Sequence, residues 1–503
     1  MSAKKFIVIG GGTSGWITAL SLRQLFADSD ITVIYSEEKG IVGVGEATTP
    51  HFVDFLKETG VDLGDFMKQV GATIKNGISF EDWNGDEKRY FHPFKETLTE
   101  FSIPRIFGHT CFDFYVKKLI NDQLPIDDYT YASRLAYAHK VDVDQTHFAF
   151  HFDANKCAKY LENLAAKRGV KIVKGEFEQA IQDDEGKITQ IIAQGRRFDC
   201  DFVFDCSGFH RAIIGGVYKQ RWVSYRDHLP MKKAITFWQE ADQRPAPYTA
   251  CIAMRAGWMW RIPLQDRVGC GYVFDSDYID VEQAKHEVEQ YYGKPVEVKK
   301  VLSFDAGRYE NIWVKNCIAV GLSGNFIEPL ESTSIWLQLS LLLTLRQFLS
   351  NIDDLDEDST RLFNELIGQD VDEKMNFVYL HYLTKRDDSE FWREFRRKTT
   401  LPSMVKEIVP FIKRGDLKFY NLRSASLPSY FALRSYLHVC AGLGLFEQKM
   451  TINNLDILQP SASDYKAMIE ESLQNCMTHA EFLSAVGCEL QGRRDSELAA
   501  NSP

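Results

Sequence analysis

The sequence predicts a mixed α/β fold: a three-layer, Rossmann-like nucleotide-binding module, an inserted antiparallel β-sheet and a mostly helical C-terminal region. Three observations lead to this prediction. A Gly-rich turn joins an apolar strand to a helix near the N-terminus, residues 230–310 alternate as antiparallel strands do, and the pattern beyond residue 350 is helical. We expect the module with its interleaved sheet over residues 1–350 and the helical region over 351–503.

Composition narrows the class of protein. A chain of 503 residues exceeds one ordinary core, so we expect two or three folding units. A net charge of −11 without a long basic run argues against nucleic acid as a partner. The ten cysteines form no Cys-x-x-Cys pair and no cluster at zinc spacing, so we expect no metal site. Without an apolar leader or a membrane-length apolar run, we expect a cytoplasmic protein with no membrane contact.

The N-terminal elements follow in the order that a nucleotide-binding unit requires. Residues 6–9 predict a buried strand, 10–15 a turn, 16–26 a helix and 31–35 a second strand. Further along, the pattern predicts these elements: two short helices within 51–80, strand-like structure over 132–150, a helix over 151–168, a strand over 170–173, a hairpin about 183–186, strands over 201–205 and 317–321, and a buried helix from 335.

The turn has the form Gly10-x-Gly12-x-x-Gly15. Its glycines allow close backbone approach, and the following helix offers free N–H groups and a favourable dipole to a pyrophosphate. We therefore expect Gly10, Gly12, Thr13, Ser14 and Gly15 to bind a cofactor. The motif alone does not separate NAD, NADP and FAD.

The residue that usually binds the ribose is displaced. An acidic side chain commonly closes the second strand, but here Tyr35-Ser36 stand there and Glu37 follows. Glu37 is our candidate for the ribose contact, and a solvated loop charge is the alternative.

Two later segments favour FAD. Asp205-Cys206-Ser207-Gly208 resembles the strand-end motif of flavoprotein monooxygenases, and the segment from Gly321 to Thr333 resembles their late flavin loop. The chain offers one credible Gly-x-Gly-x-x-Gly, so no second site for NAD(P)H is visible. The flavin would then be reduced by a separate NAD(P)H-dependent flavin reductase.

A rarer motif, Trp258-x-Trp260-x-Ile262-Pro263, resembles the signature of the flavin-dependent halogenases of the tryptophan type. The segments 75–83, 329–333 and 43–50 are also similar to segments of that family. The resemblance implies FADH2, O2 and a halide ion as reactants, a small aromatic substrate, and a helical C-terminal region that completes the substrate pocket. It adds to the expected cofactor-binding residues Gly45, Glu46, Ala47, Asp205, Gly321 and Leu330.

The resemblance implies that Lys75 and Glu331 are catalytic. Hypohalous acid formed at the flavin would be held by the Lys75 amine, and Glu331 would polarise this oxidant and stabilise the cationic ring intermediate. An apolar pocket lowers a lysine pKa and favours the nucleophilic form. The alternatives are a solvated helix-end lysine for Lys75 and a helix N-terminal charge for Glu331.

Halide and substrate contacts follow from the same resemblance. Thr333 and Ser334 would form the halide site. Ser334 stands where the family commonly has Gly, which favours bromide or iodide over chloride. His92 and Phe94 would form an aromatic platform, for which a packed turn around Pro93 is the alternative; His109 and His381 are expected to be structural.

Trp258 and Trp260, two apart on a strand, would share one face and block the substrate from reaching the flavin directly, although a packed sheet face is the simpler explanation. The last tryptophan is Trp392, and the aromatic lid typical of tryptophan-specific relatives is not apparent. We therefore expect an indole- or phenol-like substrate rather than free tryptophan. Two rival functions stay open, a flavin-dependent hydroxylase and a non-catalytic flavin-binding protein, and a homodimer is left open.

Overall fold

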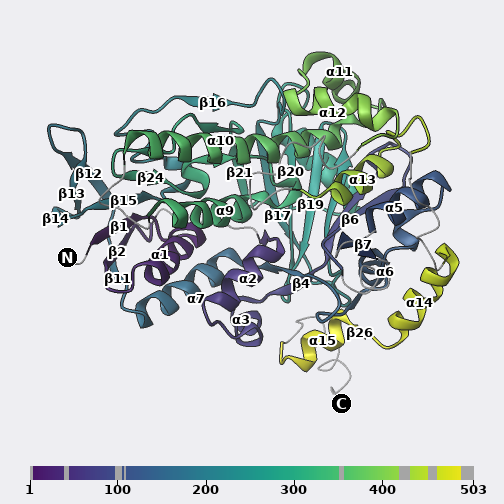
Figure 1. Ribbon diagram of the computed structural model, residues 1–503, viewed down its shortest axis with the longest axis horizontal. Coiled ribbons are helices and arrows are strands. Elements are labelled where there is room, and N and C mark those ends of the chain that lie inside the picture. Colours follow the sequence, from purple (N-terminus) through teal and green to yellow (C-terminus); the bar gives the residue numbers. More distant parts are fainter. Residues whose placement is uncertain are drawn as a thin grey trace.

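Two main β-sheets and a C-terminal group of helices make up the protein (Figure 1). The computed structural model describes residues 4–38, 45–96, 105–106, 109–110, 112–349, 356–417, 431–450 and 461–488. The domain boundary predicted at residue 350, and residues 43–44 of the Gly-rich segment 43–50, lie outside these residues.

The first sheet has six strands in the order β11-β2-β1-β15-β24-β23. The strands β11, β2, β1, β15 and β24 run parallel, and β23 closes the sheet antiparallel. Apolar runs such as Phe6-Ile7-Val8-Ile9 form its central strands because both faces are covered. The strand bounds are Lys5–Ile9 (β1), Asp30–Tyr35 (β2), Lys171–Lys174 (β11), Phe202–Asp205 (β15), Trp313–Val314 (β23) and Cys317–Ala319 (β24).

Helix α1 (Thr13–Leu25) follows β1 through the Gly-rich turn, as the sequence predicted. Gly10 has φ +128°, a backbone conformation that favours glycine. A Cβ on Gly15 would lie 1.9 Å from the carbonyl oxygen of Gly10, so only glycine lets the helix pack onto the turn. The turn therefore opens at the carboxyl end of β1, beside β15, where the order of the strands reverses and ligands usually bind.

The second sheet has seven strands in the order β21-β17-β20-β19-β18-β5-β6. It confirms the antiparallel sheet expected over 230–310, with one helix, α8 (Val281–Tyr292), inserted. Two strands from the N-terminal part, β5 and β6, complete it, and β6 forms an edge. The strand bounds are Gly77–Glu81 (β5), Arg89–Pro93 (β6), Lys233–Gln239 (β17), Thr249–Met254 (β18), Gly257–Pro263 (β19), Val268–Phe274 (β20) and Lys300–Ser303 (β21).

A small three-stranded sheet joins the two larger ones. Strand β10 (Ala149–Phe152) lies between β3 (Glu46–Ala47) and β4 (Thr73–Lys75). The two helices predicted within 51–80 are α2 (Pro50–Glu58) and α3 (Leu63–Val70). The last third of that range is not helical, because it forms β4 and the start of β5. The apolar residues of this part pack on both faces of strands, which resembles a helical pattern over so short a run.

The expectation of strand-like structure over 132–150 was mostly wrong. Helix α6 (Tyr131–Tyr137) occupies its beginning, with Tyr131, Ala132, Leu135 and Ala136 buried on one side. That spacing is helical, and the aromatic content of the segment obscured it. Strand β9 (Lys140–Val141) and β10 account for the strand content that the range does have.

Helices cover the C-terminal part, as predicted. Helix α9 (Thr333–Phe348) is the buried helix expected from residue 335, and α10 (Glu357–Leu380) packs along it across the molecule (Figure 1). The remaining helices include α5 (Phe112–Asn121), α7 (Ala154–Lys167), α11 (Glu390–Lys398), α12 (Ser403–Lys413), α13 (Leu433–Gly442), α14 (Ala462–Gln474) and α15 (His479–Ala485).

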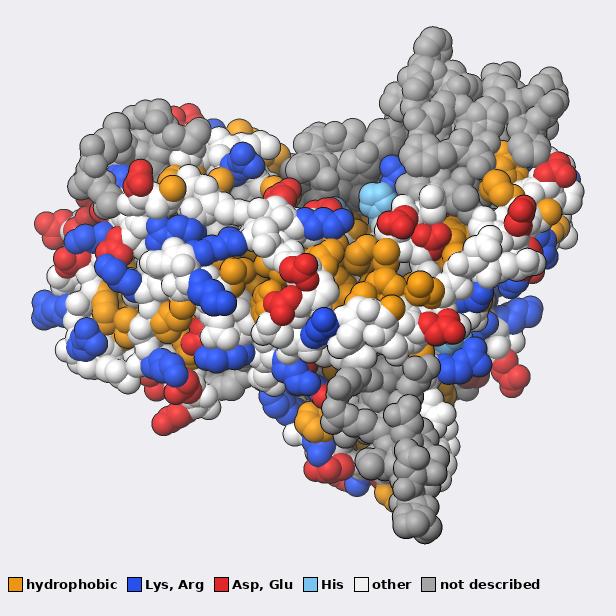
Figure 2. All heavy atoms as spheres, turned by 90° about the horizontal axis from the view of Figure 1, so that it is seen from below, with side chains coloured by type: hydrophobic (Ala, Val, Ile, Leu, Met, Phe, Trp, Pro, Cys, Tyr) orange, Lys and Arg blue, Asp and Glu red, His pale blue; other side chains and the backbone are white. Residues whose placement is uncertain are grey.

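The surface carries both signs of charge. On the face drawn in Figure 2, acidic and basic side chains of the described residues are interspersed. Among the described helices, none combines the length and the apolar character needed to cross a bilayer. In the same part of the chain, no group of three or more His, Cys, Asp or Glu side chains is placed to hold a metal ion.

His479, at the start of α15, holds the strand that carries Lys75. Its Nε2 accepts the amide N–H of Ile74 (3.0 Å) in β4, and its Nδ1 donates to the carbonyl of Pro245 (2.9 Å). Burial lowers the pKa of His479 to about 4, against a bond to Pro245 that raises it. The ring must therefore stay neutral for Ile74 to keep its acceptor.

We expect His479→Ala to lower the free energy of unfolding by about 1–3 kcal/mol, because a buried amide loses its acceptor. The pKa of His479 is 6.5 in the unfolded chain and about 4 in the folded protein. Between these two values the unfolded state binds a proton that the folded state does not, so the free energy of unfolding falls as the pH drops from 6.5 to 4. Chemical denaturation at several pH values measures both effects. His286→Ala, on an exposed residue of α8, is the control, and an equal loss there would contradict the assignment.

Candidate active site

A cavity of about 720 Å³ extends from the Gly-rich turn to the start of α9. Nine of the twelve residues predicted to bind a cofactor line it, and they come from the ends of β1 and β2, from β3 and from the loop after β24. These nine are Gly10, Gly12, Thr13, Ser14, Glu37, Gly45, Glu46, Ala47 and Gly321. The structure therefore brings together segments that are far apart in the sequence.

The end of the cavity at α1 is shaped for an anion. Gly12 is the N-cap of α1 and makes no side-chain cap, so the first N–H groups of the helix stay open. A Cβ on Gly12 would meet no described atom within 4 Å, which leaves room for a ligand against the backbone. The buried Oγ1 of Thr13 has no hydrogen-bond partner among the described residues. These features fit the pyrophosphate of a dinucleotide.

The other three predicted cofactor residues are not among those that line this cavity. Gly15 provides helix packing, as described above. The carboxylate of Asp205 accepts hydrogen bonds from the amides of Ser207, Ile213 and Ile214, so it organises the loop after β15. Leu330 is fully buried.

The ribose contact predicted for Glu37 has a competitor. Glu37 lines the cavity, but its exposed carboxylate pairs with Lys174 (2.6 Å). Glu162 of α7 also lines the cavity, is buried, and accepts the Tyr35 hydroxyl (2.9 Å). Sequence reasoning missed Glu162 because no motif marks it; the tyrosine in place of the usual acidic residue was the available signal.

Lys75 ends β4 and is completely buried. Its Nζ donates to the carbonyl oxygen of Thr48 (2.9 Å) and to the hydroxyl of Ser332 (2.8 Å), and it lies 5.2 Å from the ring centre of Phe94. Burial lowers the pKa of Lys75 to about 7, against the attraction of Glu331, which raises it. The alternative of a solvated helix-end lysine is therefore wrong.

Ser332 connects Lys75 to the large cavity. It lines that cavity and also accepts the Lys75 hydrogen bond. Its backbone has φ +56°, a left-handed conformation that is costly for a residue other than glycine. The conformation ends the turn η4 (Pro329–Glu331) and starts α9, and so it presents the hydroxyl to Lys75.

Glu331 is buried between two histidines. Its carboxylate contacts Nδ1 of His92 (2.9 Å) and Nε2 of His381 (2.8 Å). Burial alone would raise the pKa of Glu331, but the charge of His92 and the hydrogen bonds from both histidines lower it to about 2. Tyr90, two residues before His92, contacts Nδ1 of His381 (3.0 Å), which extends the chain of polar contacts.

These contacts bear on two expectations. His92 and Phe94 were expected to form an aromatic platform, which stays a prediction; the structure shows that His92 Nδ1 contacts Glu331 and that Phe94 faces Lys75. His381 was expected to be structural and is in direct contact with Glu331. Sequence reasoning missed this contact because η6 (His381–Leu383), the turn that carries His381, lies 50 residues beyond Glu331. His109 belongs to β8 (His109–Thr110), and its side chain is not described.

The residues predicted for a halide lie at the start of α9. The Oγ1 of Thr333 is buried and has no hydrogen-bond partner in the described part of the chain. Ser334 is half-buried and lines the large cavity. The first turn of a helix, with an unpaired hydroxyl, suits an anion.

The two tryptophans of β19 are packed together, with ring centres 6.0 Å apart. Trp260 lines the large cavity, whereas Trp258 is fully buried behind it and donates its Nε1–H to Glu328 (2.7 Å). A Cβ on Gly271, which lies opposite in β20, would come within 2.1 Å of the Trp260 ring. The glycine therefore makes room for the indole at the edge of the cavity.

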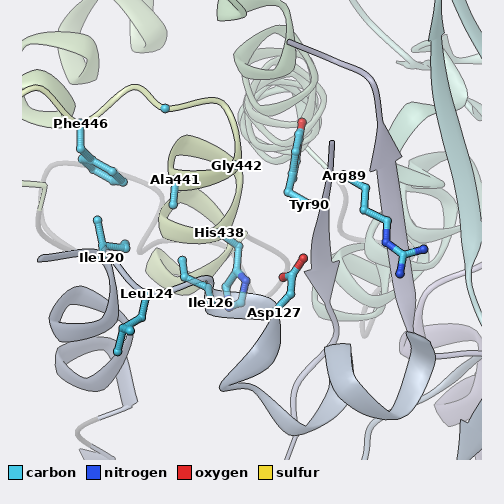
Figure 3. A pocket seen from close by; sticks show the side chains of 11 residues that line it. Arg89, Tyr90, Ile120, Leu124, Ile126, Asp127, His438, Ala441, Gly442 and Phe446 are labelled. Carbon is cyan, nitrogen blue, oxygen red and sulfur yellow. The ribbon is translucent and has the colours of Figure 1, made fainter. Parts of the chain in front are cut away.

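A second cavity, of about 260 Å³, lies along β6 against α13 and the helical turn η1 (Ile126–Asp128). His438 and Asp127 both line it, and Figure 3 shows them with Tyr90 on the strand side. Burial raises the pKa of Asp127 to about 7 and lowers that of His438 to about 3. Lys75, Glu331 and His92 are not among the residues that line it, so it is separate from the large cavity and from the residues predicted to react.

A pair of glycine substitutions separates folding from cofactor binding. We expect Gly12→Ala to keep the thermal stability of the protein but to weaken FAD binding, because the new methyl group fills the open cradle. Gly15→Ala, whose methyl group collides with Gly10, should lower the thermal midpoint without ligand. Differential scanning calorimetry and flavin titration measure the two effects. Equal loss of stability in both variants would contradict this division of roles.

Comparison with known proteins shows the family. The profile of the tryptophan halogenase family matches residues 5–454. The tryptophan 7-halogenase RebH of Lentzea aerocolonigenes is 30% identical over 490 residues, covering 88% of this chain and 91% of RebH. The solved structure of Xcc4156, a flavin-dependent halogenase from Xanthomonas campestris, superimposes with a TM-score of 0.87 at 28% identity, covering 97% of this chain and 99% of that one. BrvH, a flavin-dependent halogenase from Brevundimonas sp. BAL3, gives 0.84 at 28% identity over 96% and 99%. The chain therefore belongs to the tryptophan halogenase family and is an enzyme, a flavin-dependent halogenase.

Proposed function

We propose that this enzyme uses FADH2, O2 and a halide ion to form hypohalous acid, and that Lys75 and Glu331 direct the halogen onto an electron-rich aromatic ring. One observation carries the proposal. The buried amine of Lys75, with a pKa of about 7, reaches the cofactor-sized cavity through one hydroxyl, that of Ser332. A neutral amine at that place can accept hypohalous acid by hydrogen bonding or by reaction.

Glu331 supports the second half of the reaction. Its low pKa keeps the carboxylate charged at neutral pH, although it is buried. A fixed negative charge in a site that excludes water stabilises the positive charge that develops on a ring during halogen transfer. His92 and His381 hold this carboxylate from two sides and fix its orientation.

The large cavity would hold the flavin. Bound reduced flavin supplies the electrons that reduce O2, and the turn 10–15 and the residues about Gly45 and Gly321 would bind its pyrophosphate and ring system. The sequence offers one nucleotide motif, so a separate NAD(P)H-dependent flavin reductase would supply FADH2. The family assignment sets both rival functions aside, and the buried amine of Lys75, for which a hydroxylase or a non-catalytic flavoprotein has no need, agrees with it.

For the substrate we propose an indole- or phenol-like ring. Relatives are named for tryptophan, among them the tryptophan 7-halogenase RebH, and a structure similar to this chain is titled MibH, a lathipeptide tryptophan 5-halogenase. This chain has no tryptophan after Trp392 with which to build an aromatic lid. Tight binding and turnover of free tryptophan would overturn this substrate proposal.

One reaction mixture separates the candidate functions. It contains the protein, FAD, a flavin reductase, NADH and a panel of indoles and phenols, with chloride, bromide or iodide supplied in turn. A halogenase gives products heavier by one halogen in place of hydrogen. A product heavier by one oxygen whatever the halide, or unchanged substrates throughout, would contradict the proposed reaction.

Lys75→Ala should abolish halogenation while flavin binding and flavin reoxidation continue. Lys75→Arg should be inactive too, since an arginine stays protonated and cannot present a neutral amine. Mass spectrometry of products and flavin absorbance measure these outcomes. Halogenation that survives either change would sink the proposed role of Lys75.

Ser334 offers a test of halide preference. We expect the wild type to favour bromide or iodide and Ser334→Gly to shift products toward chloride by several-fold, because glycine frees the backbone at the start of α9. Ser334→Ala, which removes the hydroxyl but keeps the Cβ, is the matched control. A competition assay with equal chloride and bromide measures the ratio; an unchanged ratio in Ser334→Gly would contradict the proposal.

A further inference from the structure

Glu328 is a buried acid whose role the proposed reaction does not explain. Its side chain is completely buried. One oxygen, Oε2, accepts two hydrogen bonds, from Nε1–H of Trp258 (2.7 Å) and from the hydroxyl of Tyr382 (2.6 Å). The other, Oε1, has no partner among the described residues. Burial raises the pKa of Glu328 to about 7, although both hydrogen bonds lower it.

Glu328 lies next to the turn that carries Glu331. Glu328 and Glu331 stand at the two ends of one turn, η4, and each holds a residue of η6. Glu328 holds Tyr382 and Glu331 holds the neighbouring His381. Two carboxylates three residues apart therefore clamp two adjacent side chains, so a shift of Tyr382 moves the turn that presents His381.

The second bond of Glu328 reaches the wall of the cavity. Trp258 contacts Trp260, and Trp260 lines the large cavity. The nitrogen of Trp260 has no partner within the described chain, so Trp260 is positioned by packing alone, and Trp258 is the tryptophan of the pair that is fixed by a hydrogen bond. Replacing Glu328 by a side chain without an acceptor would leave the buried N–H of Trp258 and O–H of Tyr382 unpaired. The free energy lost in this way is larger than the net contribution of the two hydrogen bonds to stability.

We propose that Glu328 is a positioning residue that fixes both the Trp258–Trp260 wall and the η6 turn behind Glu331, and so keeps the oxidant on its way from the cavity to Lys75. The inference rests on the proposed function. Glu328 contacts neither the cavity nor Lys75, so it acts through Trp258 and Tyr382. Its absence would let hypohalous acid escape into solution instead of reaching the aromatic substrate.

The test compares two replacements of similar size. In Glu328→Gln the amide oxygen accepts the same two hydrogen bonds, whereas Glu328→Met offers no acceptor. The control is Glu287→Gln: Glu287 also accepts a tyrosine hydroxyl, that of Tyr272 (3.0 Å), and the amide of Arg255 (2.7 Å), and neither of these bonds in the described chain involves the wall or η4.

The first readout needs no cofactor. In protein labelled with ¹⁵N-tryptophan, nine indole N–H signals are expected, and Trp258→Phe identifies that of Trp258. Glu328→Met should move this signal to the position of an unbonded indole, while Glu328→Gln and Glu287→Gln should keep it near its place. A signal unchanged in Glu328→Met would overturn the proposal.

The second readout is a ratio that a mere loss of folded protein does not change. It divides halogenation of a reactive 1,3-diketone scavenger in bulk solution by halogenation of the aromatic substrate. We expect the ratio to rise about fivefold or more in Glu328→Met and to stay within about twofold of wild type in Glu328→Gln and Glu287→Gln, as the loss of buried hydrogen bonds implies. An unchanged ratio in Glu328→Met, or an equal rise in Glu328→Gln, would overturn the proposal.

Two further outcomes are distinguishable. If Glu328→Met does not fold, Tyr382→Phe removes one of the two donors and keeps the phenyl ring; a raised ratio supports the proposal and an unchanged ratio overturns it. If the wild type halogenates neither substrate nor scavenger with any halide, the proposed function fails, and the scavenger half of this inference fails with it, while the indole signal still reports whether Glu328 fixes Trp258.

Discussion

The burial of the Lys75 amine is the constraint on which the rest of the site depends. Removing an ammonium group from water costs several kcal/mol unless a charge partner compensates for it. Here the direct hydrogen-bond partners of Nζ are two neutral oxygens, those of Thr48 and Ser332, while Glu331 directs its own bonds to histidines. The amine therefore lowers its pKa instead of forming an ion pair. A lysine with a pKa near 7 is about half neutral at pH 7 and can act as a nucleophile, whereas a lysine in water is almost entirely protonated at that pH.

The same constraint explains the division of the site into two parts. Ser332 and Trp260 line the large cavity, whereas the buried Lys75 and Glu331 are not among the residues that line it. Trp258 closes the space behind Trp260 and is itself held by Glu328. Such an arrangement suits a reaction in which a small oxidant moves between two places while a bulky aromatic ring stays in one. The same packing also excludes water from Lys75. Contact with water would bring the pKa of Lys75 back toward its ordinary value.

Local patterns in the sequence predicted the parts of the fold that depend on local physics. The turn at Gly10, the strand at residues 202–205 and the buried helix α9 follow from glycine geometry and continuous apolar runs. Helix α6 was missed because aromatic residues such as Tyr131 and Tyr137 fit a strand face as well as a helix face. The motif resemblance singled out Lys75 and Glu331 as catalytic candidates, but it did not show what surrounds them. The contacts of His381, Glu162 and Glu328 join residues that are 50 to 127 positions apart in the sequence. Residue spacing within a motif cannot predict contacts over such separations.

The pKa of Lys75 in the intact protein is the measurement that tests this account most directly. Lysine labelled with ¹³C and ¹⁵N at the end of the side chain, compared between wild type and Lys75→Ala, gives the signal of Lys75 over a range of pH. We predict a midpoint near 7, the value to which burial lowers it, and a shift toward the ordinary value of 10.5 only on unfolding. A midpoint near 10.5 in the folded protein would mean that the amine stays charged at neutral pH, and it would contradict the role assigned to Lys75.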